Sequence, residues 1–430
     1  SNSITNSNYT KQTSGVFFSE DSALVKEGNS HSFGGGVGIY ESGTFTMNGG
    51  IISGNSALKP DGVGEAYGGG VGLLSRGVDT DHASCNKTEG LRAKFVMNGG
   101  QVTNNTATSG GGGFRAADDQ GDNKIDRKNH SVISINGGEI SNNTTAGAGG
   151  GFLIAYASLT VGGNAKIANN TATKNGGGIE VSNHSMLTMT GGNVFNNQSS
   201  GLGGGIHDSG AAATYDGTTE KTTLSISNVT FENNSATNGG AIYCKDSNSV
   251  VSIEQCVFSE NQATSGNGGA IQNAGENLTI TGCTISENTA TSNGGGLYSS
   301  GKVSLSDTSV TNNTATTDGG GIYVSSANMV ELSGKVVVKD NSTSSTGATD
   351  KGNLFVDHAT REAAIKKVGD LSGSEIHFGL TGYYYDDSEQ NHVDKTVLSG
   401  SEESSAVAND AMYMYCDAES YAPYFDSTDN

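Results

Sequence analysis

Short runs of alternating apolar and polar residues recur along most of the chain, and a turn closes each run. The runs LTMTGGNVF at 187–195 and LTITGCTI at 278–285 place apolar side chains at alternate positions. In GGGIEV at 176–181, Ile179 is expected to point inward and Glu180 outward, because side chains alternate along a strand. The pattern therefore predicts short strands separated by tight turns.

Two markers repeat in phase with these runs. A GGG or GGA cluster recurs, with its third residue at Ala270, Gly296 and Gly321, 26 and 25 residues apart, and an Asn-rich turn such as TNNTAT at 311–316 precedes it. So short a period cannot hold a propeller blade, and it lacks the spacing of leucine-rich repeats. Stacked repeats of this size pair strand on strand. We therefore predict an all-β fold: a right-handed parallel β-helix of about twelve rungs with three parallel sheets.

The alternation also predicts the lining of the helix. The apolar residue after each glycine cluster should face the interior, which gives the inward column Ile179, Ile206, Ile242, Ile271, Leu297 and Ile322. One Asn falls at the same place in each turn, and stacked amides can hydrogen-bond from rung to rung. This predicts a structural Asn ladder formed by Asn105, Asn143, Asn170, Asn197, Asn234, Asn261, Asn288, Asn313 and Asn341.

The repeat defines the domain organisation. We expect a β-helix over residues 1–380 and a C-terminal cap with an acidic tail over 381–430. The segment at 17–23 is expected to be a partial first rung, and those at 352–356 and 374–380 later rungs. Polar insertions interrupt the regular period and should project as corner loops at 58–67, 75–94, 116–130 and 209–222.

Composition narrows the class of partner. The 66 Gly with only 2 Pro argue against collagen and against a disordered linker. The net charge of −21 disfavours nucleic acid, and no apolar run is long enough to span a membrane. The first residues lack the features of a secretion signal. We expect an extracellular, cell-surface protein whose signal and anchor are not in this sequence, and a monomer.

Several repeats resemble a known family of surface proteins. GGAI at 239–242 with FSEN at 258–261, GGAI at 268–271 with ISEN at 285–288, and FENN at 231–234 are similar to the GGA[ILV] and FxxN repeats of polymorphic outer-membrane protein adhesins. More broadly, residues 16–380 resemble the pectin-lyase-like right-handed β-helix superfamily. The resemblance implies a secreted, adhesin-like module that displays binding surfaces to a glycan or protein of a host or neighbouring cell.

The alternative function is a polysaccharide lyase or glycoside hydrolase of the same fold. Such enzymes need carboxylates or Ca²⁺ ligands on one face with a base beside them. Glu260 and Glu287 occupy matching places one rung apart, but no basic residue is in phase with them. We therefore assign no catalytic residues.

Ligand-binding candidates come from two regions. The outward column of the first strand contains Tyr243, Tyr298 and Tyr323, whose rings can stack on sugars or pack across the sheet. The insertions at 75–94 and 116–130 hold or adjoin most of the Arg, including Arg76 and Arg115. Because loops on rigid scaffolds often carry binding groups, we expect the ligand at these loops first and at the Tyr column second.

Two further features are a candidate Ca²⁺-binding loop and a pair of cysteines. Asp118, Gln120, Asp122 and Asp126 have the spacing of an EF-hand-like loop without its usual Gly and final Glu, which predicts at most weak Ca²⁺ binding and no other cofactor. Cys256 and Cys283 stand at equivalent places in successive repeats. That placement allows either a disulfide or a ladder of free thiols.

Overall fold

A computed structural model of the chain describes most of the predicted repeats. The residues described are 3–5, 9–12, 16–18, 24–25, 31–40, 43–58, 65–75, 92–118, 130–210, 212–215, 218–245, 249–275, 277–325, 330–344, 352–357, 365–368, 371, 374–381, 398–400 and 414–416. They form strands and turns. Two compact units divide the chain: unit 1 comprises residues 1–236 and 241–250, and unit 2 comprises 237–240 and 251–430.

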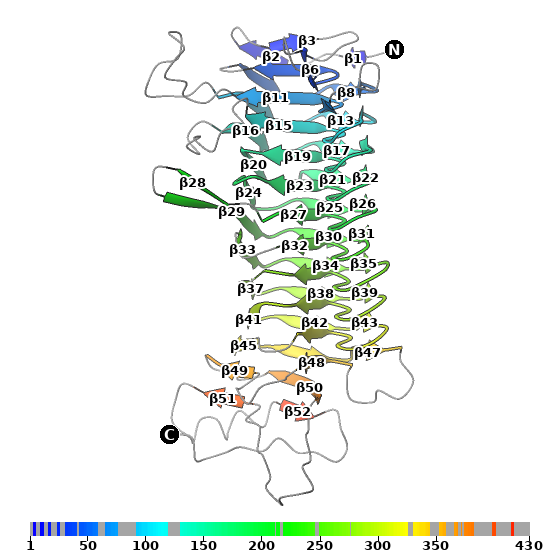
Figure 1. Ribbon diagram of the computed structural model, residues 1–430, viewed down its shortest axis with the longest axis vertical. Coiled ribbons are helices and arrows are strands. Elements are labelled where there is room, and N and C mark those ends of the chain that lie inside the picture. The colour runs from blue at the N-terminus through cyan, green and yellow to red at the C-terminus, as the bar shows by residue number, and fades with distance from the viewer. Residues whose placement is uncertain are drawn as a thin grey trace, which may run out of the picture. The chain divides into compact units, whose positions relative to one another are not determined.

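Unit 1 is built from rungs that each contribute one strand to every sheet (Figure 1). Its first sheet is β6 (Val37–Tyr40), β11 (Val71–Ser75), β15 (Phe114–Asp118), β19 (Phe152–Ala155), β23 (Ile179–Ser182), β27 (Ile206–Asp208) and β32 (Ile242–Cys244). The second is β7 (Thr44–Met47), β12 (Lys94–Met97), β16 (Ser131–Ile135), β20 (Ala157–Val161), β24 (Met186–Met189) and β29 (Thr218–Ser227). The third is β8 (Ile51–Ser53), β13 (Gln101–Thr103), β17 (Glu139–Ser141), β21 (Lys166–Ala168), β25 (Asn193–Phe195) and β30 (Thr230–Glu232). Neighbouring strands within each sheet pair in parallel, so the unit is a parallel β-helix.

Unit 2 repeats the same order of strands. Its first sheet holds β36 (Ile271–Asn273), β40 (Leu297–Ser299), β44 (Ile322–Val324) and β48 (Leu354–Asp357). Its second and third sheets hold β37 (Asn277–Thr281), β41 (Lys302–Ser306) and β45 (Val330–Ser333), and β34 (Val257–Ser259), β38 (Thr284–Ser286), β42 (Ser309–Thr311) and β46 (Val337–Lys339). β33 (Ser249–Glu254) begins in unit 1 and pairs in parallel with β37. β48 and β50 (Glu375–Thr381) pair in parallel, as expected for later rungs.

A fourth parallel sheet corrects the prediction of three. It consists of strands of two residues, β9 (Ser56–Ala57), β14 (Thr106–Ala107), β18 (Thr144–Thr145), β22 (Thr171–Ala172), β26 (Gln198–Ser199) and β31 (Ser235–Ala236) in unit 1. In unit 2 it consists of β35 (Gln262–Ala263), β39 (Thr289–Ala290), β43 (Thr314–Ala315) and β47 (Ser342–Thr343). These strands follow the Asn-rich turns, and two residues are too few for alternation to distinguish them from a turn.

The chain does not start with a parallel rung. β3 (Val16–Phe18) pairs antiparallel with β6, where a partial first rung was expected. β1 (Ser3–Thr5) and β2 (Tyr9–Gln12) likewise run antiparallel to β8 and β7. These pairings occupy backbone groups that the first rung would otherwise leave unpaired at a sheet edge.

The insertion at 209–222 is partly described. β28 (Ala212–Tyr215) pairs antiparallel with the start of β29, and the resulting hairpin projects from unit 1 (Figure 1). Near the C-terminus, β51 (Leu398–Gly400) and β52 (Met414–Cys416) pair in parallel with β49 (Ile365–Lys367) and β50. Most of the predicted C-terminal cap lies outside the described residues.

The interior confirms the predicted inward column. Ile179, Ile206 and Ile242 in unit 1, and Ile271, Leu297 and Ile322 in unit 2, are fully buried. In the first rungs of unit 1, phenylalanine rings stack inside the helix; the centroids of Phe45 and Phe95 are 5.4 Å apart, and those of Phe114 and Phe152 are 4.7 Å apart.

The Asn ladder is confirmed in both units. In unit 1, Asn143 Nδ2 donates to Oδ1 of Asn170 at 3.0 Å, and Asn170 Nδ2 donates to Oδ1 of Asn197 at 3.0 Å. The same amides also donate to main-chain carbonyls of the third sheet, such as Ile140 O at 3.0 Å. In unit 2, Asn288 and Asn313 are joined in the same way at 2.9 Å. Each buried amide therefore stabilises both the turn and the adjacent rung.

The three glycines of each cluster are required for different reasons: the first by its backbone conformation, and the second and third by the space around them. Gly176 has a φ of +65°, which L side chains rarely adopt. A Cβ on Gly177 would lie 2.4 Å from the backbone oxygen of Gly204 and 2.6 Å from the backbone of Gln198. On Gly178, a Cβ would lie 2.6 Å from Gly205 O and 3.3 Å from the Asn197 side chain. The third position is the least crowded, and Ala241 and Ala270 occupy it in other rungs.

Candidate functional site

The outer face of the first sheet in unit 1 brings together charged and aromatic side chains. Arg115, Leu153, Glu180, His207 and Tyr243 occupy the same register position on successive strands from β15 to β32. This is the outward column predicted from alternation. It is less exposed than expected, because in-register neighbours about 4.8 Å away cover one another: Glu180 is 6 % exposed and His207 is 2 % exposed.

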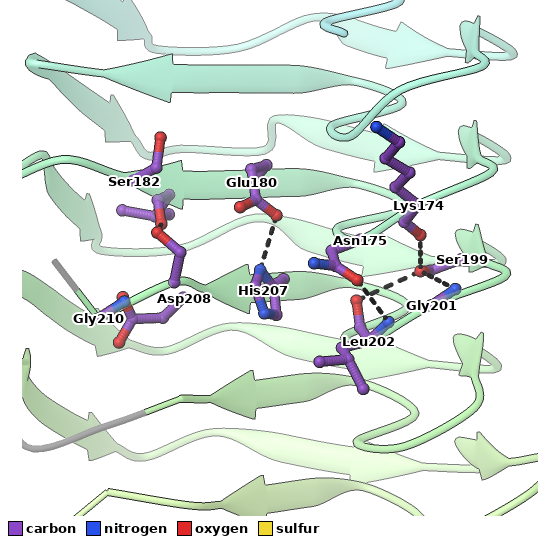
Figure 2. Close-up of polar contacts among 12 residues, drawn as sticks. Lys174, Asn175, Glu180, Ser182, Ser199, Gly201, Leu202, His207, Asp208 and Gly210 are labelled. Carbon is purple, nitrogen blue, oxygen red and sulfur yellow. Dashed lines mark hydrogen bonds and ion pairs between the residues drawn. The ribbon is translucent and has the colours of Figure 1, made fainter. Parts of the chain in front are cut away.

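The centre of the column is a buried carboxylate–imidazole pair. Nδ1 of His207 lies 2.7 Å from Oε2 of Glu180, one rung away (Figure 2). The ring of His207 also contacts Tyr243, with centroids 5.5 Å apart. Nε2 of His207 has no hydrogen-bond partner among the described residues. The arrangement orients the imidazole and leaves one of its nitrogens without a partner, as in acid–base dyads.

Asp208 follows His207 on β27 and is also buried. The amide of Gly210 donates to its Oδ1 at 3.0 Å (Figure 2). Burial raises the pKa of this carboxyl from 3.8 to about 6, although Ser249, Gly210 and His207 oppose the shift. Cys244 is buried as well; its own burial and, to a lesser extent, the nearby Asp208 carboxyl raise the pKa of the Cys244 thiol.

Arg115, a predicted ligand residue, is held against an aromatic ring. Its Cζ lies 4.8 Å from the centroid of Tyr67, whose hydroxyl donates to Oε2 of Glu65 at 2.6 Å. Burial lowers the pKa of Arg115, whereas Tyr67, Glu65 and Glu180 oppose that change. Burial and the bond to Glu65 raise the pKa of Tyr67 to about 12. The guanidinium of Arg115 is therefore held by its cation–π contact with Tyr67. Its Nε has no hydrogen-bond partner among the described residues.

The predicted Tyr column is not a freely exposed stripe. In unit 2, Tyr298 and Tyr323 stack with centroids 5.3 Å apart and nearly parallel planes, and Tyr323 stacks on Phe355 at 5.4 Å. Tyr323 is only 8 % exposed, while Tyr298 and, in unit 1, Tyr243 are half-buried. Cross-strand packing, one of the two roles considered for these rings, therefore uses much of their surface.

Cys256 and Cys283 lie in this structure as free thiols, which is the ladder arrangement of the two alternatives. The amide of Cys256 donates to Sγ of Cys283 at 3.3 Å. Hydrogen bonds from Cys256 lower the pKa of the Cys283 thiol, against the effect of its burial. The thiols continue the rung-to-rung stacking of the turn between the second and third sheets.

The loop candidates stay predictions. Arg76, Gln120, Asp122 and Asp126 lie outside the described residues, and Asp118 is described only by its backbone at the end of β15. Among the residues that the structure describes, no three His, Cys, Asp or Glu side chains gather where they could hold a metal ion.

A further set of polar contacts was missed in the sequence. Oδ1 of Asn175 accepts from the amide of Leu202 at 3.1 Å, and the Ser199 hydroxyl donates to the carbonyls of Lys174 and Leu202 (Figure 2). In unit 2, Asn238 accepts from the amide of Asn267 in the same way, at 2.9 Å. The signal was present, because an Asn or Asp precedes the glycine cluster in several repeats.

The fourth sheet of unit 1 presents an uncharged outer face, which we name the corner face. It consists of two adjacent columns, Asn104, Asn142, Asn169 and Asn196 at the turns, and Thr106, Thr144, Thr171 and Gln198 on β14, β18, β22 and β26. The Asn residues have φ between 54° and 56° and are exposed. The strand residues pair in exact parallel register and are exposed or half-buried. No charged side chain occurs in 103–109, 141–147, 168–173 or 195–201. The exposed Lys174, in register with Gly147 and Gly201, borders the face on one rung.

The comparison with known families agrees with this architecture. A family model described as a right handed beta helix region matches residues 216–361. The chain is a right-handed parallel β-helix. No curated protein and no solved structure matches it significantly. Because the β-helix fold serves enzymes and non-enzymes alike, its activity must be argued from the surfaces described above.

No helix with the length and hydropathy needed to cross a membrane occurs in the described parts of the β-helix.

Proposed function

We propose that this β-helix is a secreted or surface-displayed, adhesin-like binding module that presents a rigid scaffold to a glycan or protein of a host or neighbouring cell. The similarity of its GGAI and FxxN repeats to those of polymorphic outer-membrane protein adhesins supports this function. A monomer without a resident cofactor, apart from weak Ca²⁺ binding at residues 118–126, belongs to the same proposal.

The observation that carries the proposal is the corner face. Uncharged polar side chains, exposed or half-buried, repeat once per rung over consecutive rungs, fixed by strand register and by the buried Asn ladder behind them. Such a surface is preorganised, so a ligand would order few side chains on binding. Regular exposed amides and hydroxyls suit the recognition of a polar ligand.

The acid–base groups support binding over hydrolysis. The carboxylate of Glu180 is bonded to His207, and the guanidinium of Arg115 lies on Tyr67. A glycosidase needs two carboxyl groups facing the scissile bond across about 5–10 Å. Glu180 is instead sequestered by its neighbour in the sheet.

One experiment separates binding from catalysis. The full chain is immobilised and exposed to a glycan array and to surface proteins extracted from candidate host cells, and the same polysaccharides are assayed in solution for release of reducing ends or unsaturated products. Saturable retention without product release is expected. Turnover of any polysaccharide at enzyme-like rates would overturn the proposal.

A second candidate function is a polysaccharide lyase or glycoside hydrolase, favoured by the Glu180–His207 pair with its unpartnered Nε2. If that pair acts as an acid–base dyad, His207→Gln must abolish product release and leave retention of the polysaccharide unchanged. Equal product release by the variant and the original chain would exclude the dyad.

A further inference from the structure

We infer that the corner face of unit 1 binds a neutral polysaccharide that lies along the stacking direction of the rungs. The inference rests on the proposed binding function and names its site and ligand class. It differs from the sequence expectation, which placed the ligand at the insertions and then at the Tyr column.

The first argument is periodicity. Thr106, Thr144 and Thr171 are direct partners in parallel pairing, so equivalent oxygens repeat at the rung spacing of about 4.8 Å. One sugar residue of an extended polysaccharide has a similar length. A polysaccharide that lies across the rungs can therefore place the hydroxyls of successive sugars against successive rungs. A compact ligand would contact only one or two rungs.

The second argument is hydrogen-bonding capacity. A side-chain amide offers two donors and an acceptor oxygen, and a hydroxyl offers a donor and an acceptor. The bonds between neighbours use only part of this capacity: Thr106 and Thr144 are joined at 3.1 Å, and Asn233 donates to Asn196 at 2.7 Å. The remaining donors and acceptors match the mixed donor–acceptor character of sugar hydroxyls.

The third argument is charge. The net charge of the chain is −21, yet the corner face of unit 1 has none. In unit 2 the equivalent turn positions include Glu260, Glu287 and Asp340, all exposed. An anionic polysaccharide would be repelled by the protein as a whole, and only Lys174, on one rung beside the face, offers it a cation. The ligand class is therefore neutral.

The test uses the full chain and soluble neutral polymers (galactomannan, mixed-linkage glucan, yeast mannan and dextran), with polygalacturonate as the charged comparison. Calorimetry should detect binding of at least one neutral polymer. Longer oligosaccharides of that polymer should bind more tightly than short ones. The affinity should change little between about 50 and 500 mM NaCl, because no ion pair contributes.

Two variants locate the site. Thr144→Val with Thr171→Val removes two hydroxyls while keeping the β-branched shape, and should weaken binding about fivefold or more. Asn142→Gly with Asn169→Gly removes two amides at positions whose φ glycine also adopts, and should weaken it similarly. The matched control, Thr289→Val with Thr314→Val in unit 2, should bind as the original chain does. Unchanged melting temperatures confirm that all variants fold.

The outcomes are distinguishable. Affinity unchanged in both unit 1 variants, or lost equally in the unit 2 control, overturns the inference. Retention of a host protein or of an anionic glycan without any neutral polymer also overturns it, while leaving the proposed binding function intact. Failure to bind any glycan or cell-surface protein defeats both.

Discussion

Nδ1 of His207 and Oε2 of Glu180 lie 2.7 Å apart on adjacent strands of one parallel sheet, both side chains being almost fully buried. Parallel in-register pairing places them directly beside each other, since their β-strands align Glu180 with His207. A carboxylate desolvated in this way depends on its partner, because neither group can recover its lost contacts with water.

Removing one member of this pair should cost more than replacing both. We expect Glu180→Ala to lower the free energy of unfolding by about 3 kcal/mol, since it leaves both ring nitrogens of His207 unpaired. The double variant Glu180→Leu/His207→Phe should lie within about 1 kcal/mol of the original chain, because an apolar pair needs no partner and the Phe ring can still pack on Tyr243. Denaturant unfolding followed by circular dichroism measures both. A double variant as unstable as the single one would contradict this account.

The sequence predicted the fold and much of this column but misjudged its exposure. The glycine clusters fix the phase, so Glu180 and His207, 27 residues apart like Gly178 and Gly205, fall on neighbouring rungs with the same outward direction. Alternation predicts whether a side chain points inward or outward, but it does not predict how much of that side chain is buried by side chains of the neighbouring rungs. The column was therefore expected to be exposed, and the Glu180–His207 contact was not anticipated.

Other features were beyond the sequence for different reasons. The strands of the fourth sheet are too short for a period of two to be visible, so the pattern around Thr106 and Ala107 predicts only an Asn-rich turn. The antiparallel pairing of Val16–Phe18 could not be foreseen, because apolar alternation is the same for both strand directions. For Cys256 and Cys283, spacing establishes proximity but does not establish that a disulfide forms.

Of the two neighbouring Asn residues in each turn, the buried one of the Asn ladder should be sensitive to substitution and the exposed one of the corner face should not. Asn170 accepts from the amide and side chain of Asn143 and donates to Asn197 and Ile140. Asn170→Ala would leave these buried groups unpaired and should cost about 3 kcal/mol or more. The adjacent Asn169 is exposed with a φ of 55°, so Asn169→Gly should change stability by about 0.5 kcal/mol or less. Equal losses in the two variants, measured by denaturant unfolding, would show that the ladder does not stabilise the rungs.

The second and third glycines of a cluster should differ in their response to the same substitution. Gly177→Ala forces a Cβ against backbone atoms of two neighbouring segments and should destabilise the chain by about 3 kcal/mol. Gly178→Ala should cost less, because its Cβ would crowd one backbone oxygen and Ala241 and Ala270 already occupy this position in other rungs. Comparing the melting temperatures of the two variants tests the difference, and a reversed order would contradict the assignment of backbone crowding to the second glycine.

The stability of the chain should depend on pH through Asp208, whose pKa is raised by burial from 3.8 to about 6. A carboxyl with a raised pKa favours the folded state most when protonated. This contribution is full below pH 3.8, declines as the pH rises through about 6, and is lost above it. The difference between the two pKa values corresponds to about 3 kcal/mol, so Asp208→Asn should stabilise the chain by up to that amount at pH 8 and by almost nothing at pH 4. The amide oxygen of Asn in Asp208→Asn can still accept the hydrogen bond from Gly210. Asp208→Ala has no such acceptor and should be less stable than Asp208→Asn at every pH.

The measurement is the free energy of unfolding of each variant and of the original chain at the same series of pH values. The difference between them isolates the effect of Asp208, because the other titrating groups cancel. A gain from Asp208→Asn that is as large at pH 4 as at pH 8 would show that this carboxyl does not control the pH dependence.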